Sequence, residues 1–404
     1  MLGLRSLKTS STILNINSKN LLSIHITKPA LTSLLNNSLA LSRWSNKNST
    51  RLQHSTSPQN SINDPIISNN KKYQDLIKNG VFTKEQIIQS EKDRLNGLGP
   101  IISKLPKKII PYCELMRLEK PVGTWLLYLP CTWSIIISSI MLVSQGANIG
   151  LSQTLYMLTL FGLGSLIMRG AGCTINDLLD RNLDDKVIRS LQRPIASGRV
   201  TPVQATTFLT AQTALGLGIL TQLPHECWWL GLASLPIVFT YPLFKRFTYY
   251  PQAALSACFN WGALLGFPAM GLVDWSVMLP LYGATYIWCM IYDTIYAHQD
   301  KKFDIKAGIK STALAWGDSS KKIFYGLGSV QMSLLALTCY NAGILMGPGV
   351  LCGLGIFGYR LFNMIKKVDL NNPGNCWKWF KSNIDTGLFF TGALFFDYLL
   401  NLFF

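Results

Sequence analysis

The chain has 404 residues, of which 49% are hydrophobic and 14% are charged, and its formal net charge is +17. Soluble domains carry about 25% charged residues, so this composition argues against a soluble protein and predicts one that lies in a lipid bilayer. We expect no nucleic acid among its partners.

Residues 1–63 hold seven Lys or Arg and no Asp or Glu, and they are rich in Ser, Thr and Asn. A basic, acid-free amino-terminal stretch is typical of a mitochondrial transit peptide. We therefore predict a disordered leader that is cleaved between Arg43 and Asn70. A basic tail without a targeting role is the alternative.

Residues 64–110, which we name the lead-in segment, are mixed in charge and partly helical in pattern. They predict a soluble stretch on the matrix side of the membrane. Lys104, Lys107 and Lys108 are placed to hold it on the membrane surface.

From Val122 onward, long apolar runs alternate with short connections. A bilayer core about 30 Å thick needs about 20 residues of helix to cross it. Residues 111–404 are therefore predicted to form one all-α domain, a bundle of nine transmembrane helices around a central cavity. The predicted spans are 122–144, 151–175, 203–222, 227–243, 253–272, 276–297, 323–341, 348–366 and 384–404.

The connections between these spans differ in charge. Those after the second, fourth, sixth and eighth spans are rich in Lys and Arg, whereas the other four contain neither. By the positive-inside rule, the charged connections and the lead-in segment share one side of the membrane. If the leader is a transit peptide, the protein is a multi-pass protein of the mitochondrial inner membrane whose charged side, with the active site, faces the matrix.

The first acidic cluster follows the second span. Asn176, Asp177, Asp180 and Asp184 lie within about 100° of one another if the helix continues, since an α-helix turns about 100° per residue. This spacing predicts one polar face at the mouth of the span.

The second acidic cluster, Asp293, Asp300 and Asp304, follows the sixth span and falls within about 40° by the same arithmetic. Carboxylates gathered at membrane depth repel one another, so a cation is expected to hold them. Hard oxygen ligands suit Mg²⁺, which carboxylates commonly share with substrate phosphates. The sequence thus predicts two carboxylate faces that meet across a cavity and hold Mg²⁺.

Basic residues follow both clusters and are the expected complement to a diphosphate. For any single one of them, a role in membrane topology alone is the alternative. The candidates are Lys186, Arg189, Arg193, Lys245, Arg246, Lys306 and Lys310.

The stretch "NDLLDRNLD" at 176–184 resembles the NDxxDxxxD motif of the UbiA superfamily of intramembrane prenyltransferases. "DTIYAHQDKKFD" at 293–304 resembles the second Asp-rich motif of that superfamily. Around them, "RLEKPVGTWLLYLPCTW", "RPIASGRVTP" and "YPLFKRFTYYPQ" are similar to its branch that prenylates 4-hydroxybenzoate in ubiquinone synthesis. The resemblance covers roughly residues 111–404. Its motifs are specific in combination, since soluble isoprenyl diphosphate synthases share such Asp motifs but lack membrane spans.

The resemblance implies that two Mg²⁺ ions bridge the aspartates of both clusters to a polyprenyl diphosphate. Ionisation of the allylic C–O bond would let the ring of 4-hydroxybenzoate attack ortho to its hydroxyl, and the ring proton would leave to a carboxylate or to diphosphate. Asn176 and the YxxxK pair Tyr241 and Lys245 would lie beside the diphosphate. Other enzymes of ubiquinone biosynthesis would be candidate partners.

The carboxylate of the aromatic acid needs a cation, and Arg fits because its planar fork matches a carboxylate and stays charged when partly buried. Arg169 lies two helical turns before Asn176 on nearly the same face, and a lone Arg inside an apolar span is costly unless it has a task. Arg117, which opens "RLEKPVG", is the second candidate; an interfacial anchor is its alternative role.

Other functions fit part of this pattern. Within the superfamily, a haem farnesyltransferase or a quinone-precursor prenyltransferase is the runner-up, and the run "DTIYAHQD" argues against both. A mitochondrial transporter or cation channel also carries intramembrane acids, but these should lie near the middle of spans rather than at their ends. A purely structural membrane protein would have no use for two acidic faces.

Overall fold

The computed structural model describes residues 65–188, 190–301, 304–305 and 308–403, without the side chains of Leu183, Pro242 and Lys245. The predicted transit peptide, residues 1–63, lies outside the described residues, and so do Arg189 and Lys306. Residues 65–404 form one compact unit. The described part contains helices and turns and no strand, which confirms the predicted all-α class.

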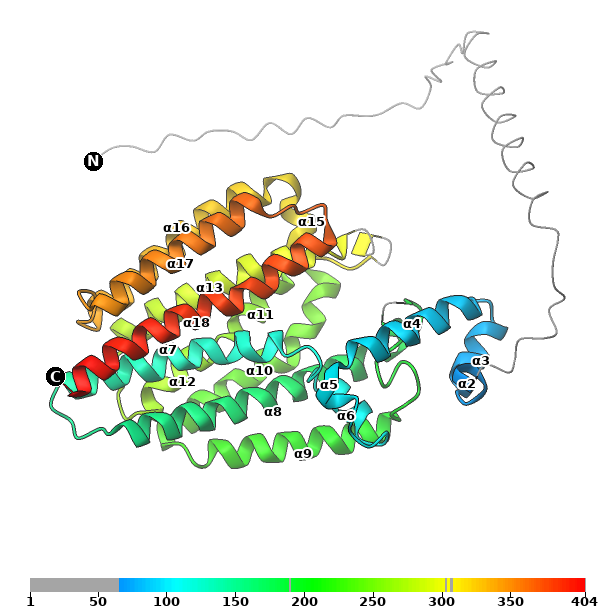
Figure 1. Ribbon diagram of the computed structural model, residues 1–404, viewed down its shortest axis with the longest axis horizontal. Coiled ribbons are helices and arrows are strands. Elements are labelled where there is room, and N and C mark those ends of the chain that lie inside the picture. The colour runs from blue at the N-terminus through cyan, green and yellow to red at the C-terminus, as the bar shows by residue number, and fades with distance from the viewer. Residues whose placement is uncertain (1–64, 189, 302–303, 306–307, 404) are drawn as a thin grey trace, which may run out of the picture. The chain divides into compact units, whose positions relative to one another are not determined.

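Figure 1 labels the helices of the described part. In chain order they are α2 (Pro65–Ser68), α3 (Lys71–Lys78), α4 (Lys84–Gly97), α5 (Gly99–Ile102), α6 (Ile110–Leu115), α7 (Val122–Ser144), α8 (Leu151–Asp184), α9 (Pro202–Leu220), α10 (His225–Phe247), α11 (Pro251–Phe259), α12 (Gly262–Ala269), α13 (Trp275–Ala297), α15 (Thr312–Trp316), the short 3₁₀ helix η1 (Gly317–Ser319), α16 (Ser320–Asn341), α17 (Pro348–Lys367) and α18 (Pro373–Phe403).

Eight of the predicted spans each overlap one helix of the described part, and the fifth overlaps two; five helical stretches there are long and apolar enough to cross a membrane. The number of nine crossings therefore stays a prediction. The five are Val122–Ser144, Leu151–Asn182, Thr312–Asn341, Pro348–Lys367 and Pro373–Phe403.

The fifth predicted span is broken into α11 and α12. Between them, the side chain of Asn260 donates to the carbonyl of Ser256 at 2.9 Å. Beyond the break, α12 lies so close to α7 that a Cβ at Gly266 would collide with Ser134. Small residues permit such close helix packing in membranes, and the apolar run gave no sign of the interruption.

The core of the bundle lies around α7, which packs against α8, α12 and α18. Trp133 of α7 is 1% exposed and stacks on Trp288 of α13 with ring centroids 5.1 Å apart. Phe357 of α17 and Phe390 of α18 meet the same indole edge-on. This aromatic centre ties α13, α17 and α18, from the second half of the chain, to α7.

The charged connections gather at one end of the bundle, and the carboxyl terminus lies at the other (Figure 1). Lys310 donates to the carbonyl of Phe247 at 3.1 Å, which joins the connections after α13 and α10. Lys321 donates to the carbonyl of Lys366 at 3.3 Å, which brings the end of α17 to the same place. This grouping matches the predicted charged side, while the compartment that it faces stays a prediction.

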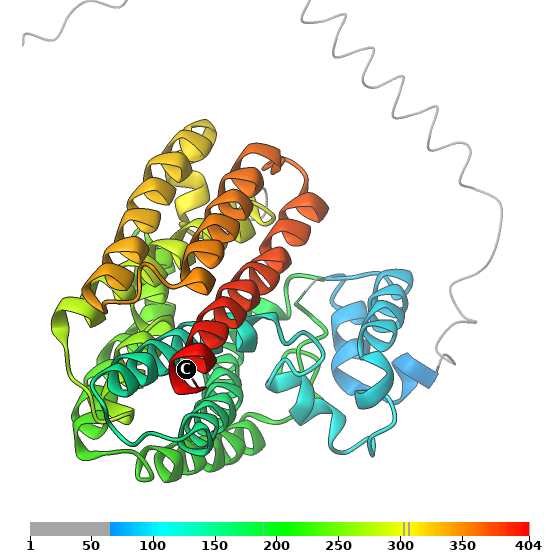
Figure 2. The same ribbon diagram turned by 60° about the vertical axis from the view of Figure 1, so that its left-hand side comes forward.

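The lead-in segment packs on the connection between α8 and α9 (Figures 1 and 2). Tyr73, Leu76 and Ile87 of α3 and α4 form a small buried core with Leu191 of that connection. Lys104, Lys107 and Lys108 are exposed, so their contact with a membrane surface stays a prediction.

Candidate active site

A cleft of about 940 Å³ lies at the charged end. Its walls come from α4, α6, the stretch from α6 to the start of α7, α8, the connection after α8, α13 and the start of α18. Arg117, Arg169 and Arg193 line it together with Asp293 of the second Asp-rich motif. The first motif adjoins the lining through ion pairs of Asp177 with Arg117 and of Asp184 with Arg193.

The first acidic cluster lies on one continuous helix, because α8 runs to Asp184. Asp177, Asp180 and Asp184 are 1%, 8% and 7% exposed. One oxygen of Asp177, Oδ2, is buried without a hydrogen-bond partner. A hard anionic oxygen with a free lone pair is the kind of ligand that Mg²⁺ prefers.

Two arginines of the cleft hold this cluster from outside. Arg117 Nη2 donates to Asp177 Oδ1 at 2.8 Å, and Arg193 Nη1 donates to Asp184 Oδ2 at 2.8 Å. Burial works against the charge of Arg193, but Asp177 and Asp184 outweigh it and raise the pKa of Arg193. The guanidinium of Arg193 therefore stays charged at the cleft wall.

Arg117 is held in an uncommon backbone conformation. Its φ is 58°, in the left-handed region that residues other than glycine rarely adopt. Its Nη1 donates to the carbonyl of Glu114 at 2.9 Å. Together with the bond from Nη2 to Asp177, this contact fixes both terminal nitrogens of the guanidinium. Such conformations persist where the surroundings hold them, and they cluster at functional sites.

Arg169 lies deeper on α8 than the acidic cluster. Its guanidinium is 5.6 Å from the centre of the Phe259 ring and interacts electrostatically with Asp293 and Tyr241. A Cβ at Gly123, the glycine of "RLEKPVG", would collide with it. The absence of a side chain at Gly123 thus lets α7 lie against this guanidinium at the cleft wall.

The first motif also contacts the predicted YxxxK tyrosine. Asn176 donates from Nδ2 to the hydroxyl of Tyr241 at 2.7 Å. The side chain of Lys245 lies outside the described residues, so its predicted place beside a diphosphate stays a prediction.

The second acidic cluster departs from its predicted geometry. Helix α13 ends at Ala297, and the amide of Asp300 bonds the carbonyl of Ala297 at 3.1 Å in a turn. The assumption of one continuous helix is therefore wrong for Asp300 and Asp304. Among the described residues that line the cleft, Asp293 is the member of this cluster.

Within the described ranges, no three His, Cys, Asp or Glu side chains stand close enough together to hold a metal ion. Asp177 and Asp184 pair with arginines instead. The predicted set of metal ligands, three aspartates from each cluster, stays a prediction.

Of the remaining predicted bases, Lys186, Arg246 and Lys310 have described side chains, and none of the three is part of the cleft lining. Lys186 and Arg246 are exposed. Lys310 lies 5.3 Å from the ring centre of Tyr249.

The sequence reasoning missed two features of the cleft. Glu119 lines it with Oε2 buried and without a hydrogen-bond partner, and burial raises the pKa of Glu119. Helix α4 forms a wall through Glu85, Gln89 and Asp93 among others. The acid inside "RLEKPVG" was a signal for the first feature, whereas no local pattern links α4 to a site about 85 residues later.

Residues 127–393 match the model of the UbiA prenyltransferase family. The mitochondrial 4-hydroxybenzoate polyprenyltransferase of Saccharomyces cerevisiae is 68% identical over 323 residues, which cover 80% of this chain and 86% of that protein. The protein of the same name from Homo sapiens is 46% identical and covers 71% of this chain and 75% of its own length.

Solved structures share the fold at low sequence identity. The apo structure of a UbiA homologue from Aeropyrum pernix has a TM-score of 0.56 at 19% identity and covers 68% of this chain and 97% of its own. A UbiA homologue from Archaeoglobus fulgidus, bound to GPP and Mg²⁺, has a TM-score of 0.54 at 19% identity and covers 72% and 99%.

Proposed function

Because this chain belongs to the UbiA prenyltransferase family, we propose that it transfers a polyprenyl group from polyprenyl diphosphate to 4-hydroxybenzoate. The new bond forms at the ring carbon ortho to the hydroxyl, and diphosphate is released, an early membrane step of ubiquinone biosynthesis. The observation that carries this proposal is the 68% identity over 80% of the chain to a 4-hydroxybenzoate polyprenyltransferase. A transporter, a channel and a structural protein have no comparable support.

Mg²⁺ is the cofactor that fits the first acidic cluster, and Asp177, Asp180 and Asp184, with Asp293 and the predicted Asp300 and Asp304, would hold it. When bound, it would neutralise charge on the diphosphate leaving group. The support is the buried, unpaired Oδ2 of Asp177 and the purely carboxylate donor set. The homologue from Archaeoglobus fulgidus that binds GPP and Mg²⁺ adds a precedent in the same fold.

Two arginines of the cleft wall, Arg117 and Arg193, assist departure of the diphosphate. Arg117 and Arg193 are each anchored to an aspartate by one nitrogen. A guanidinium has five N–H donors, so each keeps donors for diphosphate oxygens while the allylic C–O bond breaks. Being held in place beforehand, they stabilise the leaving group without reorganising.

Aromatic residues line the cleft next to these charges. Tyr296, Trp377 and Phe380 all belong to the lining, and the Tyr296 and Phe380 rings lie 4.8 Å apart. The face of an aromatic ring attracts a cation. These rings suit the allylic carbocation and exclude water while the aromatic acceptor attacks.

Arg169 is the favoured partner of the acceptor's carboxylate. Arg117 already bonds Asp177 and the carbonyl of Glu114, whereas the Arg169 guanidinium lies next to Gly123 and 5.6 Å from the Phe259 ring centre. The acceptor would then lie between Arg169 and Asp293. The ring proton leaves to a carboxylate of the cleft or to diphosphate, which balances the new C–C bond.

The proposed location is the mitochondrial inner membrane, with the cleft open to the matrix. Relatives named as mitochondrial support the organelle, and the charged connections at the end that carries the cleft support the orientation. Other enzymes of ubiquinone biosynthesis are proposed partners.

Product analysis tests this function. Membranes that contain the chain are supplied with labelled 4-hydroxybenzoate, a polyprenyl diphosphate and Mg²⁺. We expect labelled 3-polyprenyl-4-hydroxybenzoate and an equal amount of diphosphate. Prenylation of a different acceptor in its place, with 4-hydroxybenzoate left unchanged, would refute the assignment.

A further inference from the structure

The connection between α8 and α9, residues 185–201, carries Arg193 and contains no regular helix in its described part. An irregular segment of this length costs conformational entropy to order. Something else must therefore hold Arg193 in place against Asp177 and Asp184. The lead-in segment holds this connection by three kinds of contact, the second of which runs through Glu114 of α6.

The first contact is apolar. Leu191 of the connection is fully buried among Tyr73, Leu76 and Ile87, and Ile188 packs against the same cluster. Leu191 lies two residues from Arg193 in sequence, so its burial limits where the arginine can go.

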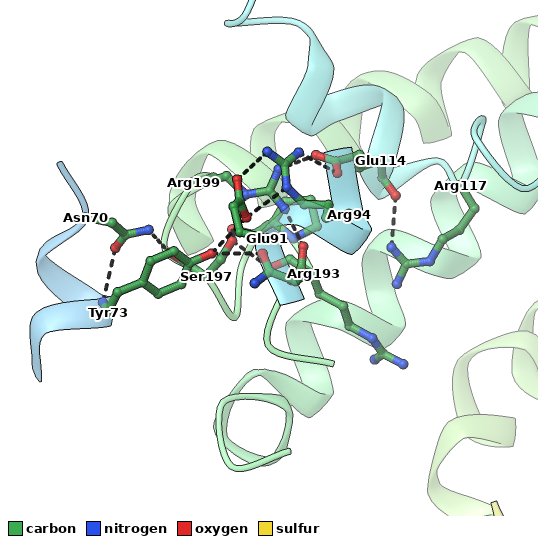
Figure 3. Close-up of polar contacts among 11 residues, drawn as sticks. Asn70, Tyr73, Glu91, Arg94, Glu114, Arg117, Arg193, Ser197 and Arg199 are labelled. Carbon is green, nitrogen blue, oxygen red and sulfur yellow. Dashed lines mark hydrogen bonds and ion pairs between the residues drawn. The ribbon is translucent and has the colours of Figure 1, made fainter. Parts of the chain in front are cut away.

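The second contact is a buried ionic network, shown in Figure 3. The carboxylate of Glu114, which is 4% exposed, accepts from Arg94 of α4 at 2.9 Å and from Arg199 of the connection. Arg94 is held in turn by Glu91 at 2.6 Å, and Arg199 also donates to the carbonyl of Gln192. Each carboxylate of this network pairs with at least one guanidinium, and such charged hydrogen bonds fix the relative positions of the groups they join.

The third contact is a set of hydrogen bonds across more than 90 residues. Tyr73 donates to Gln192 Oε1 at 2.9 Å, and burial raises the pKa of Tyr73 to about 12, so its hydroxyl stays protonated. Asn70 donates to the carbonyl of Ser197 at 2.9 Å. Ser90 donates to the carbonyl of Ile188 at 3.3 Å.

Glu114 links this network to the acidic cluster. Its carboxylate holds the connection through Arg199, and its carbonyl accepts from Arg117 Nη1 at 2.9 Å. Glu114 thereby helps to position both Arg117 and Arg193, the two arginines that contact Asp177.

We propose that α3 and α4 of the lead-in segment act as a clamp on residues 185–201 and position Arg193 over the carboxylates for the diphosphate of the prenyl donor. The clamp residues are positioning residues, since they act through Arg193. This inference rests on the proposed prenyltransferase function. It assigns to the lead-in segment a role in binding the donor but none in binding the aromatic acceptor.

Two clamp variants that lie outside the cleft lining test the inference. Arg199→Leu removes the ionic contact to Glu114, and the milder Tyr73→Phe removes the hydrogen bonds to Gln192 and Glu91. We expect Arg199→Leu to raise the KM for polyprenyl diphosphate about tenfold, Tyr73→Phe to raise it less, and the KM for 4-hydroxybenzoate to stay nearly constant.

A matched control is Arg360→Leu. Arg360 is also half-buried and bonds Thr386 and the carbonyl of Ser382, but it joins α17 to α18. It should leave both KM values unchanged. If it raises the donor KM as Arg199→Leu does, the effect is a general loss of packing and the clamp is refuted.

A double variant separates positioning from stability. If the clamp acts through Arg193, then Arg193→Ala combined with Arg199→Leu should raise the donor KM no further than Arg193→Ala alone, since effects through a shared partner do not add. Additive increases, or equal increases in both KM values, would overturn the proposal.

Amide hydrogen exchange gives a readout that does not depend on the reaction. Exchange over residues 185–201 should quicken in Tyr73→Phe and Arg199→Leu and stay unchanged in Arg360→Leu, while α7 exchanges at its normal rate. Unchanged exchange in both clamp variants would refute the clamp and leave the proposed function standing. A wild-type chain that prenylates no 4-hydroxybenzoate would refute the proposed function, whatever the exchange shows.

Discussion

Arg117 donates to Asp177 at 2.8 Å across 60 residues of sequence, from a backbone held at a φ of 58°. The contact joins "RLEKPVG" to the first Asp-rich motif. It makes the acidic cluster and its counter-charge a single unit before any substrate binds, so Arg117 is a structural partner of the cluster rather than an interfacial anchor.

We predict that Arg117→Gln lowers prenyl transfer by ~10- to 100-fold, as expected when a charged hydrogen bond of ~1.5 to 3 kcal/mol is lost. Arg117→Lys should fall in between, because it keeps the charge but not the fork that reaches both Asp177 and Glu114. Turnover at saturating 4-hydroxybenzoate measures the effect. Wild-type turnover in Arg117→Gln would show that the contact is dispensable.

Metal dependence is the second prediction. Prenyl transfer should vanish with chelation and return with Mg²⁺, and Asp180→Ala and Asp300→Ala should each abolish it, because both clusters are predicted to hold the metal. Asp385→Ala is the control, since that side chain is 63% exposed on α18. An active Asp300→Ala variant would remove the second cluster from the metal site.

The third prediction concerns the acceptor. Arg169→Leu should raise the KM for 4-hydroxybenzoate by ~10- to 100-fold and that for the prenyl donor much less. Gly123→Ala should act in the same direction, because its Cβ would collide with the Arg169 guanidinium. Gly172→Ala on the same helix as Arg169 meets nothing within 4 Å and is the matched control. A rise in the donor KM alone would place Arg169 at the diphosphate instead.

Orientation in the membrane is the fourth prediction. In a variant that lacks the exposed Cys352, a cysteine at exposed Ser319 should label from the matrix only, and one at exposed Gln145 from the opposite side. Ser319 lies at the charged end and Gln145 at the other, so the pair reports on the positive-inside argument. The reverse labelling pattern would contradict the proposed orientation but would leave the proposed reaction unaffected.

Asp397 gives the fifth prediction, which is about stability. This buried carboxylate accepts from the amides of Gly349 and Val350 at 2.8 and 2.7 Å and so caps the start of α17. Asp397→Leu should destabilise the protein by about 1 to 3 kcal/mol, because two buried donors lose their acceptor. Thermal unfolding in detergent measures it, with Asp385→Leu as the exposed control; equal melting temperatures in both variants would argue against the cap.

Local patterns were enough to predict part of this structure. Apolar runs locate helices because a bilayer demands continuous hydrophobic length, and the spacing of Asp177, Asp180 and Asp184 predicted one face because α8 does continue to Asp184. The end of α13 at Ala297 and the break at Asn260 depend on packing between helices, which periodicity does not encode. These are the places where the predicted geometry of the second cluster and of the fifth span departed from the structure.

The cleft wall was the least predictable part for a related reason. Some of its polar contacts join residues far apart in sequence, such as Arg117 with Asp177 over 60 positions and Glu114 with Arg199 over 85. Each of these residues reads as an ordinary charge in a polar stretch. Only the folded structure shows that these oppositely charged side chains pair with one another in a buried environment.

If the predicted leader is removed by a peptidase, the bond from Asn70 to Ser197 sets a limit on where the cut can fall. Asn70 also caps α3 by accepting from the amides of Lys72 and Tyr73. A cut after this residue would leave a charged amino terminus at the start of α3, where the helix dipole disfavours positive charge. A cleaved chain that keeps residues 185–201 anchored would therefore have to begin before Asn70. An affinity tag intended to leave its kinetics unchanged belongs upstream of Pro65 or behind the carboxyl terminus.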